Sequence, residues 1–395
     1  MPMSASRPPE PASSPVRDLL ALTRRPEVIS FAGGLPAPDL IDVPGLRASF
    51  AAVLAGDAGE GRLQYSTSEG DPDLRRALTA VEARRGLAPD PDEILVTTGS
   101  QQALGLVAHA LLTPGAPVLT EEPSYLAALQ VLRLHGAEPV GVECDDDGVD
   151  PEALDRAAAA TGARVVYLVP TFQNPTGRTL SAERREAVAE VIRRRDLWLV
   201  EDDPYGQLRF RGASQTPLAA LPGMAERTIA ISSLSKIVAP GLRIGWLLAP
   251  EELRARLVIV KQATDLHTST VDQAAAAHWL AEVDLDAHLM RLRRAYAERH
   301  DALLAGLPAA LPPGSTFNDP DGGMFCWVRL PDGTDSGALL QRALDRDVAY
   351  VPGASFFAGP PDPATLRLAY SVERPARIAA GLERLAEALA GVGAR

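Results

Sequence analysis

The sequence is poor in cysteine and has no long apolar run, and each absence excludes a class of protein. Two cysteines, Cys144 and Cys326, are too few for a disulfide framework, so we predict a protein of the reducing cytoplasm. No run of about 18 apolar residues is present, so we predict no transmembrane helix. Residues 1–15 lack the apolar core of a signal peptide and are interpreted as a flexible lead-in.

Several ligand-binding motifs are also missing. Neither cysteine stands in a spacing typical of metal ligands, and we predict no metal site. No Gly-x-Gly-x-x-Gly follows a predicted strand, and no P-loop occurs. The net charge of −12, from 39 basic and 51 acidic residues, argues against non-specific binding to nucleic acid or to an anionic membrane. A small anionic ligand stays possible, because local basic groups decide its binding.

Apolar segments from residue 94 onward predict an α/β fold. Seven of them have the length and composition of buried strands: 94–98, 117–120, 139–142, 164–169, 197–200, 227–231 and 244–249. Because the connections are long and mostly helical, we predict a mostly parallel seven-stranded sheet with helices on both faces. After about residue 250 this alternation stops, and strands at 324–330, 348–353 and 366–370 with a closing helix at 375–389 predict a smaller α+β domain.

We accordingly predict four parts in the chain. After the lead-in, residues 16–50 form an N-terminal helix and an extended arm, which belongs to the small domain and covers the substrate. The arm contains Gly33 and Gly34, which let a backbone approach a ligand closely. Residues 51–285 form the large domain, and residues 286–395 form the small C-terminal domain.

Polar residues follow the predicted strands at the points where these end. Ligands of parallel α/β sheets bind outside the carboxyl ends of the strands. After the first strand, Ser100 and Gln101 open a helix whose amide groups form an anion site, although Ser100 alone is also a common N-cap. After the second strand, Tyr125 has the shape to stack on a planar ligand, or simply to pack.

Three further turns supply an amide, an acid and a phenol. Asn174 lies in a turn that a proline and a glycine make rigid. This rigidity fixes the direction of its side chain. Asp202 follows a buried strand, where a carboxylate is costly unless it has a partner such as a protonated ring nitrogen. Tyr205 follows closely and has a hydroxyl that can donate to a phenolate oxygen.

Lys236 lies in a serine-rich turn between two apolar runs, with Arg243 seven positions further on. A lone lysine in such a turn is usually a surface residue, but here an anion site, an aromatic ring, an acid and an amide accompany it. A ligand that needs both a phosphate cradle and an imine-forming lysine is pyridoxal 5′-phosphate. The combined turns therefore predict this cofactor.

These motifs give the chain a resemblance to a known family. From about Val16 to the C-terminus it resembles the fold-type I pyridoxal-phosphate aminotransferases of class I/II, in particular the 2-aminoadipate and kynurenine-type branch. The resemblance is carried by the stretches 30–38, 98–104, 173–177, 201–205 and 233–237, in this order and spacing. Transcription regulators related to this family carry a winged-helix domain ahead of the unit, and too few residues precede it here for that interpretation.

The resemblance implies a role for each residue of the predicted site. Lys236 would bind the cofactor as a Schiff base and move the substrate Cα proton, and Asp202 would pair with the pyridinium nitrogen. Tyr205 and Asn174 would hydrogen-bond the phenolate oxygen, and Tyr125 would stack on the ring. The phosphate would be held by Ser100, Gln101, Ser233, Ser235, Arg243 and, from the partner subunit of a homodimer, Tyr65.

Substrate recognition would depend on a carboxylate clamp. Arg367 stands between two leucines where the family places its α-carboxylate arginine, and a guanidinium binds a carboxylate in a bidentate way. Gly34 and Asn174 would complete the clamp. Arg17 lies where related enzymes offer an arginine that reads the substrate side chain, with Arg24 and Arg25 as rivals.

The predicted reaction is transamination between an L-amino acid and a 2-oxo acid. The resemblance implies glutamate and 2-oxoglutarate as one pair, with a 2-aminoadipate-like, aromatic or branched-chain partner. Decarboxylation, β-elimination and racemisation stay open as alternatives, because one fold hosts several reactions of this cofactor. A non-catalytic sensor that binds the cofactor is a further alternative.

Overall fold

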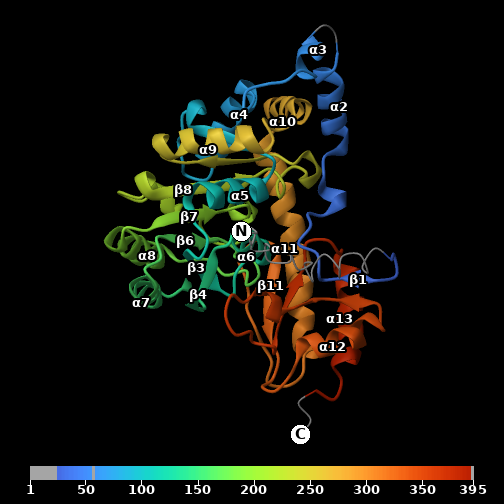
Figure 1. The fold of residues 1–395 in the computed structure, drawn as a ribbon. Helices are drawn as coiled ribbons and strands as arrows, with labels where there is room; N and C mark the ends of the chain where they lie inside the picture. The colour runs from blue at the N-terminus through green and yellow to red at the C-terminus, as the bar shows by residue number, and fades with distance from the viewer. Residues whose placement is uncertain (1–24, 56–57, 393–395) are drawn as a thin grey trace, which may run out of the picture.

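The fold is organised around one large, twisted β-sheet, which the computed structural model shows together with its flanking helices (Figure 1). The structure describes residues 25–55 and 58–392. The sheet has the strand order β2-β9-β8-β7-β6-β3-β4-β5. The strands are β2 (Ile94–Thr97), β3 (Pro117–Glu122), β4 (Glu138–Asp145), β5 (Gly148–Val149), β6 (Val165–Leu168), β7 (Trp198–Asp202), β8 (Thr228–Ser233) and β9 (Gly245–Leu248).

The predicted seven strands and the mostly parallel sheet are confirmed. β8, β7, β6, β3 and β4 pair in parallel, whereas β9 runs antiparallel to both of its neighbours, β2 and β8. The structure adds an eighth strand, β5, which pairs with the end of β4. Two residues are too short to give an alternating pattern, so the sequence did not indicate this strand.

Helices cover both faces of this sheet, which explains why its central strands read as continuous apolar runs. In β6, Val165 and Tyr167 join the core on one face, and Val166 and Leu168 join the core on the other. The first face is covered by α5 (Ser100–Leu111) and α6 (Leu126–Leu134), and the second by α7 (Pro151–Thr161) and α8 (Ala182–Arg195). Side chains that alternate along a strand are therefore buried on both sides.

A second, smaller sheet lies toward the C-terminus, with the order β10-β11-β14-β13. Its strands are β10 (Thr316–Phe317), β11 (Phe325–Arg329), β13 (Val351–Pro352) and β14 (Thr365–Ala369). α12 (Ser336–Leu344) and α13 (Pro375–Leu389) accompany it, and α13 agrees with the predicted closing helix. The predicted strand at 348–353 is two strands in the structure, because β12 (Val348–Ala349) pairs instead with β1 (Ile29–Ser30).

The long helix α11 (Leu285–Ala310) connects the two sheets (Figure 1). Its first half packs Leu289 and Tyr296 into the core of the large sheet, and its second half packs Leu303 and Leu307 into the core of the small one. Three helices beside the large sheet, α4 (Pro72–Ala83), α9 (Glu251–Thr264) and α10 (Thr270–Glu282), precede it in the chain.

The predicted division of the chain stays a prediction. Its boundary at 285 coincides with the first residue of α11, whereas the boundary at 50 falls inside α2 (Val43–Val53), which packs on α10. Strand β1 belongs to the predicted arm and is tied to β12 of the C-terminal part. The predicted lead-in, residues 1–15, lies outside the described residues, as do residues 16–24 of the part that follows it.

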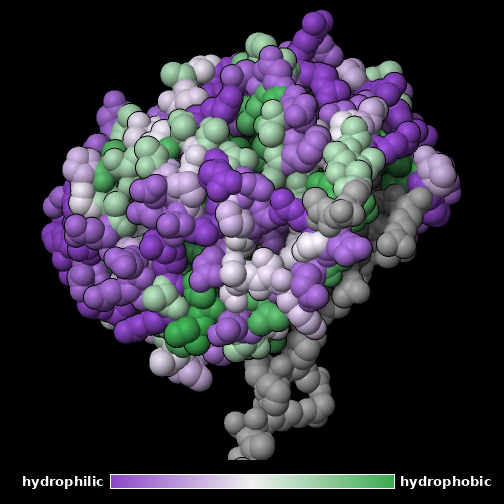
Figure 2. All heavy atoms as spheres, turned by 90° about the horizontal axis from the view of Figure 1, so that it is seen from above, coloured by the Kyte–Doolittle hydropathy of each residue, from purple (hydrophilic) through white to green (hydrophobic). Residues whose placement is uncertain are grey.

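The face seen in Figure 2 carries mostly hydrophilic side chains, with apolar ones in small groups. Within residues 25–55 and 58–392, none of the helices combines the length and the apolar character needed to cross a lipid bilayer.

Candidate active site

The predicted residues meet in one cavity of about 310 Å³ at the carboxyl edge of the large sheet. Its lining includes nearly every residue that the sequence nominated: Gly34, Ser100, Gln101, Tyr125, Asn174, Asp202, Tyr205, Ser233, Ser235, Lys236, Arg243 and Arg367. The antiparallel direction of β9 matters here, because it brings Arg243, just before β9, to the edge where β8 ends. Strand ends that are far apart in the sequence thus share one edge.

Lys236 lies between this cavity and the N-terminal arm. Its Nζ donates a hydrogen bond to the carbonyl oxygen of Gly34 at 2.8 Å. Loss of hydration, followed by the charges of Arg367 and Arg243, lowers the pKa of Lys236 to about 8, although Asp202 opposes this shift. A substantial fraction of the amine is therefore neutral near physiological pH and able to act as a nucleophile or base.

Asp202 ends β7 and is buried. One carboxylate oxygen, Oδ2, accepts a hydrogen bond from the Tyr167 hydroxyl at 2.8 Å. The other, Oδ1, is buried without a hydrogen-bond partner among the described residues. Burial raises the pKa of Asp202 to about 7. An orphaned carboxylate oxygen in a cavity fits the protonated ring nitrogen of pyridoxal phosphate, which would supply both the missing donor and a positive charge.

The opposite end of the cavity fits a phosphate. Helix α5 begins after Gly99, whose positive φ of 78° suits glycine, and no described side chain caps this N-terminus. A Cβ atom at Gly99 would lie 2.5 Å from an Nη of Arg243, so the turn and the guanidinium approach closely. Ser233 and Ser235 add hydroxyls that lie 2.7 Å apart. Helix amides, hydroxyls and a guanidinium together form an anion site.

Two tyrosines and an amide lie between these ends. Burial raises the pKa of Tyr125 to about 12 and shifts the pKa of Tyr205 upward as well, so both phenols keep their protons. The Tyr205 ring meets Phe325 edge to face, with 5.8 Å between the ring centres. The Asn174 side chain accepts a hydrogen bond through Oδ1 from Arg367 at 2.7 Å.

Arg367 on β14 has the surroundings of a binding residue. It is 3% exposed, and its second Nη donates to the carbonyl oxygen of Ala32 at 2.6 Å. Its guanidinium lies 4.4 Å from the ring centre of Phe325 and 5.1 Å from that of Phe356. Burial lowers the pKa of Arg367 to about 10, which still leaves it charged at neutral pH. Asp202 lines the same cavity, but no described carboxylate forms an ion pair with Arg367, so the guanidinium is free to bind a carboxylate from a ligand.

Two nominated residues do not join the cavity. Tyr65 is 79% exposed and does not line the cavity, and its ring lies edge to face with that of His267, with 5.8 Å between the ring centres. Arg17 lies outside the described residues, as does its rival Arg24, whereas Arg25 forms an ion pair with Asp347 at 3.7 Å.

Sequence reasoning missed the groups that support the nominated ones. Tyr167 belongs to an apolar strand in the sequence pattern, and the pairing of β6 with β7 puts it on the same sheet face as Asp202. Phe325 and Phe356, which flank Arg367, come from strands and turns with no polar signal of their own. The Ala32 carbonyl carries no sequence signal at all.

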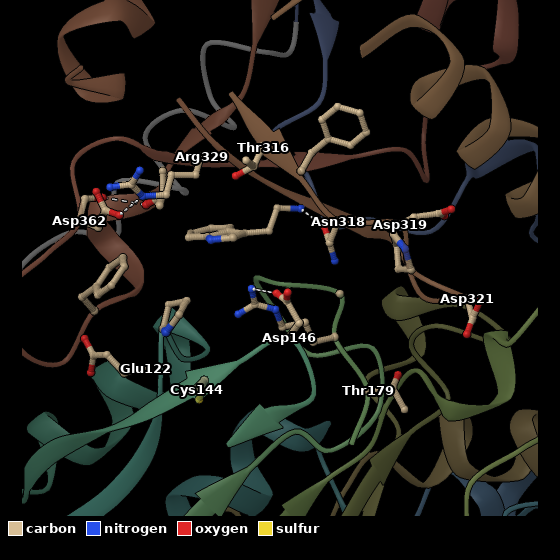
Figure 3. A pocket seen from close by; sticks show the side chains of 18 residues that line it. Glu122, Cys144, Asp146, Thr179, Thr316, Asn318, Asp319, Asp321, Arg329 and Asp362 are labelled. Atoms are coloured by element: carbon tan, nitrogen blue, oxygen red, sulfur yellow. Dashed lines mark hydrogen bonds and ion pairs between the residues drawn. The ribbon is translucent and has the colours of Figure 1, made fainter. Parts of the chain in front are cut away.

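A larger cavity of about 800 Å³ lies elsewhere, between β4 and the small sheet (Figure 3). Its charged side chains are mostly paired with one another. Arg178 donates to Asp146 at 2.7 Å, and Arg329 donates to Asp362 at 3.1 Å. None of the nominated residues lines it, so size does not identify the site here.

Comparisons with known proteins show the family of the chain. The family described as aminotransferase class I and II matches residues 46–385. The chain is 39% identical to a 2-aminoadipate transaminase of Thermus thermophilus, over 96% of this chain and 94% of the relative. It is 37% identical to aromatic-amino-acid aminotransferase 1 of Thermococcus litoralis, over 95% and 91% of the two chains.

A solved structure shows the same fold. It is the α-aminoadipate aminotransferase LysN of Thermus thermophilus, in complex with N-(5′-phosphopyridoxyl)-L-leucine. The TM-score is 0.91 at 38% identity, covering 97% of this chain and 96% of the other. The chain belongs to the class I and II aminotransferases and is a pyridoxal-phosphate-dependent aminotransferase.

Proposed function

We propose that this aminotransferase uses glutamate and 2-oxoglutarate as one of its substrate pairs, and that Arg367 binds the α-carboxylate of each substrate. The observation that carries this proposal is the buried, unneutralised guanidinium of Arg367 in the same cavity as Lys236. A carboxylate on Arg367 would hold an amino acid with its α-carbon beside the lysine amine. Pyridoxal phosphate, when bound, supplies the electron sink that stabilises negative charge at that carbon.

The residues of the chain divide the remaining work. Lys236 Nζ would take up and later release the proton that leaves the substrate Cα, a role that its lowered pKa favours. With pyridoxal phosphate bound, Asp202 Oδ1 would accept the ring N–H, Tyr205 and Asn174 would hold the phenolate oxygen, and Tyr125 would stack on the ring. Ser100, Gln101, Ser233, Ser235 and Arg243, which line the cavity, would hold the phosphate.

The N-terminal arm closes the substrate side. A Cβ atom at Gly34 would lie 2.6 Å from the Phe325 ring, so the arm comes as near to β11 as a backbone can. Leu35 follows it, lines the cavity and is half exposed, which offers an apolar contact to the substrate side chain. We propose a 2-aminoadipate-like, aromatic or branched-chain amino acid as the second partner, in line with the names of the relatives. Arg17 stays our candidate for reading a charged side chain.

We further propose that the working unit is a cytoplasmic homodimer. Leu63 and Tyr65 are neighbouring apolar or aromatic side chains with exposed fractions of 69% and 79%. A second copy would bury them and could bring Tyr65 to the phosphate of the partner's site. Both cysteines are free, which fits the cytoplasm.

Single-turnover spectroscopy with a panel of amino donors tests the proposed substrates. Each donor is mixed with the cofactor-loaded enzyme, and 2-oxoglutarate is then added while glutamate is measured. Glutamate formation with regeneration of the starting spectrum is expected for the true donors. Release of CO₂ or pyruvate without glutamate would contradict the proposed pair and favour decarboxylation or β-elimination. Sedimentation of the loaded protein tests the dimer.

A further inference from the structure

We propose that Tyr167 is a positioning residue for the cofactor, although it does not line the cavity. Its hydroxyl fixes the carboxylate of Asp202 so that Oδ1 alone faces the pyridine ring, and it keeps this carboxylate ionised. The inference rests on the proposed role of Asp202. It concerns Tyr167, which would act on the cofactor only through Asp202.

The sheet places the two side chains together. β6 and β7 run in parallel, and Tyr167 lies opposite Val200 in their register. Asp202 is two residues further along, hence on the same face as Val200. A diagonal neighbour of this kind is within reach of a long aromatic side chain. The Tyr167 hydroxyl accordingly meets Asp202 Oδ2 at 2.8 Å.

The hydrogen bond has a fixed direction. Tyr167 is 2% exposed and lies in the apolar core under α5 and α6, and burial holds the pKa of its phenol well above 10. The phenol is therefore always the donor and Asp202 Oδ2 the acceptor. Because Oδ2 is occupied and Oδ1 is not, the two oxygens differ, and the carboxylate cannot turn without breaking this contact.

The same contact sets the charge of Asp202. The groups that face this carboxyl group are Tyr167, Asp203, Arg85, Lys236, Tyr125 and Tyr205. Burial and the neighbouring Asp203 favour the protonated form, whereas the Tyr167 hydroxyl, Arg85 and Lys236 favour the ionised form. Removal of the hydroxyl takes away the side-chain hydrogen bond that favours the ionised carboxylate. The carboxyl group would then hold its own proton more often and would pair less well with a protonated ring nitrogen.

The test is the Tyr167→Phe variant, with Tyr350→Phe as a matched control. Tyr350 is equally buried, and its hydroxyl donates to the Ser336 carbonyl at 2.6 Å in the C-terminal part, so it reports the cost of losing a buried phenol elsewhere. Two quantities are measured: the dissociation constant of pyridoxal phosphate from the apo-protein, and the ring-nitrogen chemical shift of labelled cofactor across pH.

For Tyr167→Phe we expect the dissociation constant to rise about 10-fold, the usual effect of a lost hydrogen bond to a charged group. The pH at which the ring nitrogen loses its proton should fall. Tyr350→Phe should change neither quantity. Unchanged affinity and unchanged ring protonation in Tyr167→Phe would overturn the inference.

Two more variants separate the possible failures. If Asp202→Asn leaves ring protonation intact, the proposed role of Asp202 itself is wrong. If Asp202→Asn abolishes it while Tyr167→Phe does not, only the role of Tyr167 is wrong. Should Tyr167→Phe fail to fold, 3-fluorotyrosine at position 167 keeps the shape and strengthens the donor, and ring deprotonation should then move to higher pH. No movement would again overturn the inference.

Discussion

The chain contains two lysines among its 39 lysine and arginine residues: Lys261 is fully buried, and Lys236 is partly exposed at the cavity. Lys236 lies at the cavity, and among the described residues its amine has one hydrogen-bond partner, the carbonyl of Gly34. Lys261 on α9 donates to Gln102, Asp265 and Thr268, each at 3.0 Å. Burial lowers the pKa of both.

The two lysines differ in the charges near them as well as in exposure. Asp265 stabilises the charged form of Lys261, and this ion pair offsets part of the burial cost. Lys236 has instead the guanidiniums of Arg367 and Arg243 near it, which favour loss of its proton. A buried lysine with a carboxylate partner is structural, whereas one among cations beside a cavity is prepared for chemistry.

The largest expected effect comes from Lys236→Ala. This variant should lose turnover by about 10⁴-fold or more, because the nucleophile and the base are one residue. Borohydride reduction of the loaded wild-type enzyme, followed by peptide mapping, should place the cofactor on Lys236 and leave Lys261 unmodified. Because the chain has two lysines, the peptide map distinguishes between two possible positions of the label. A label on Lys261 would contradict the distinction drawn between the two lysines.

Arg367 is tested by a pair of variants, Arg367→Lys and Arg367→Gln. Both should weaken amino-acid binding by about 10²-fold, since neither offers the bidentate donor pair. Arg367→Gln should in addition raise the pKa of Lys236, because it removes a neighbouring charge, whereas Arg367→Lys should not. Cofactor retention is the control, and its loss in both variants would count against Arg367 as the carboxylate clamp.

Lys261→Met should act on stability more than on chemistry. It leaves Asp265 without its cation, and since this carboxylate is partly exposed we expect a loss of about 2 kcal/mol in the free energy of unfolding. Urea denaturation of the apo-protein measures it, and the double variant Lys261→Met with Asp265→Asn should recover part of the loss. A collapse of turnover with normal stability would show that Lys261 belongs to the active site.

The sequence predicted most of this fold because the central strands are short apolar runs separated by long helical connections. The carboxyl edge then followed from the parallel direction of the strands, and twelve of the nominated residues line the cavity there. The short strand β5 and the split of residues 348–353 between two sheets were not predictable, because pairs of residues carry no periodicity.

The contacts that support the site residues could not be predicted from the sequence either. Tyr167 and Asp202 are 35 residues apart, and their hydrogen bond depends on the register of β6 against β7. Lys261 and Gln102 are 159 residues apart, and nothing local distinguished the buried Lys261 from a solvent-exposed lysine on α9. Long-range register decides which polar groups meet, and a single sequence does not display it.

The smallest expected effect is a pH dependence that tells the two lysines apart. Below pH 8 the Lys236 amine of the apo-protein is mostly protonated and cannot attack the cofactor aldehyde. The rate of cofactor attachment should therefore rise about 10-fold per pH unit up to about pH 8 and level off above it. Stopped-flow absorbance measures this rate, and pyridoxamine phosphate, which cannot link to lysine, controls for titration of the phosphate.

Lys261→Met should leave the midpoint unchanged, because Lys261 has its own carboxylate and lies outside the cavity lining. A midpoint near the ordinary pKa of lysine would mean that Arg367 and Arg243 do not lower the pKa of Lys236. The two lysines would then differ only in their access to the cavity.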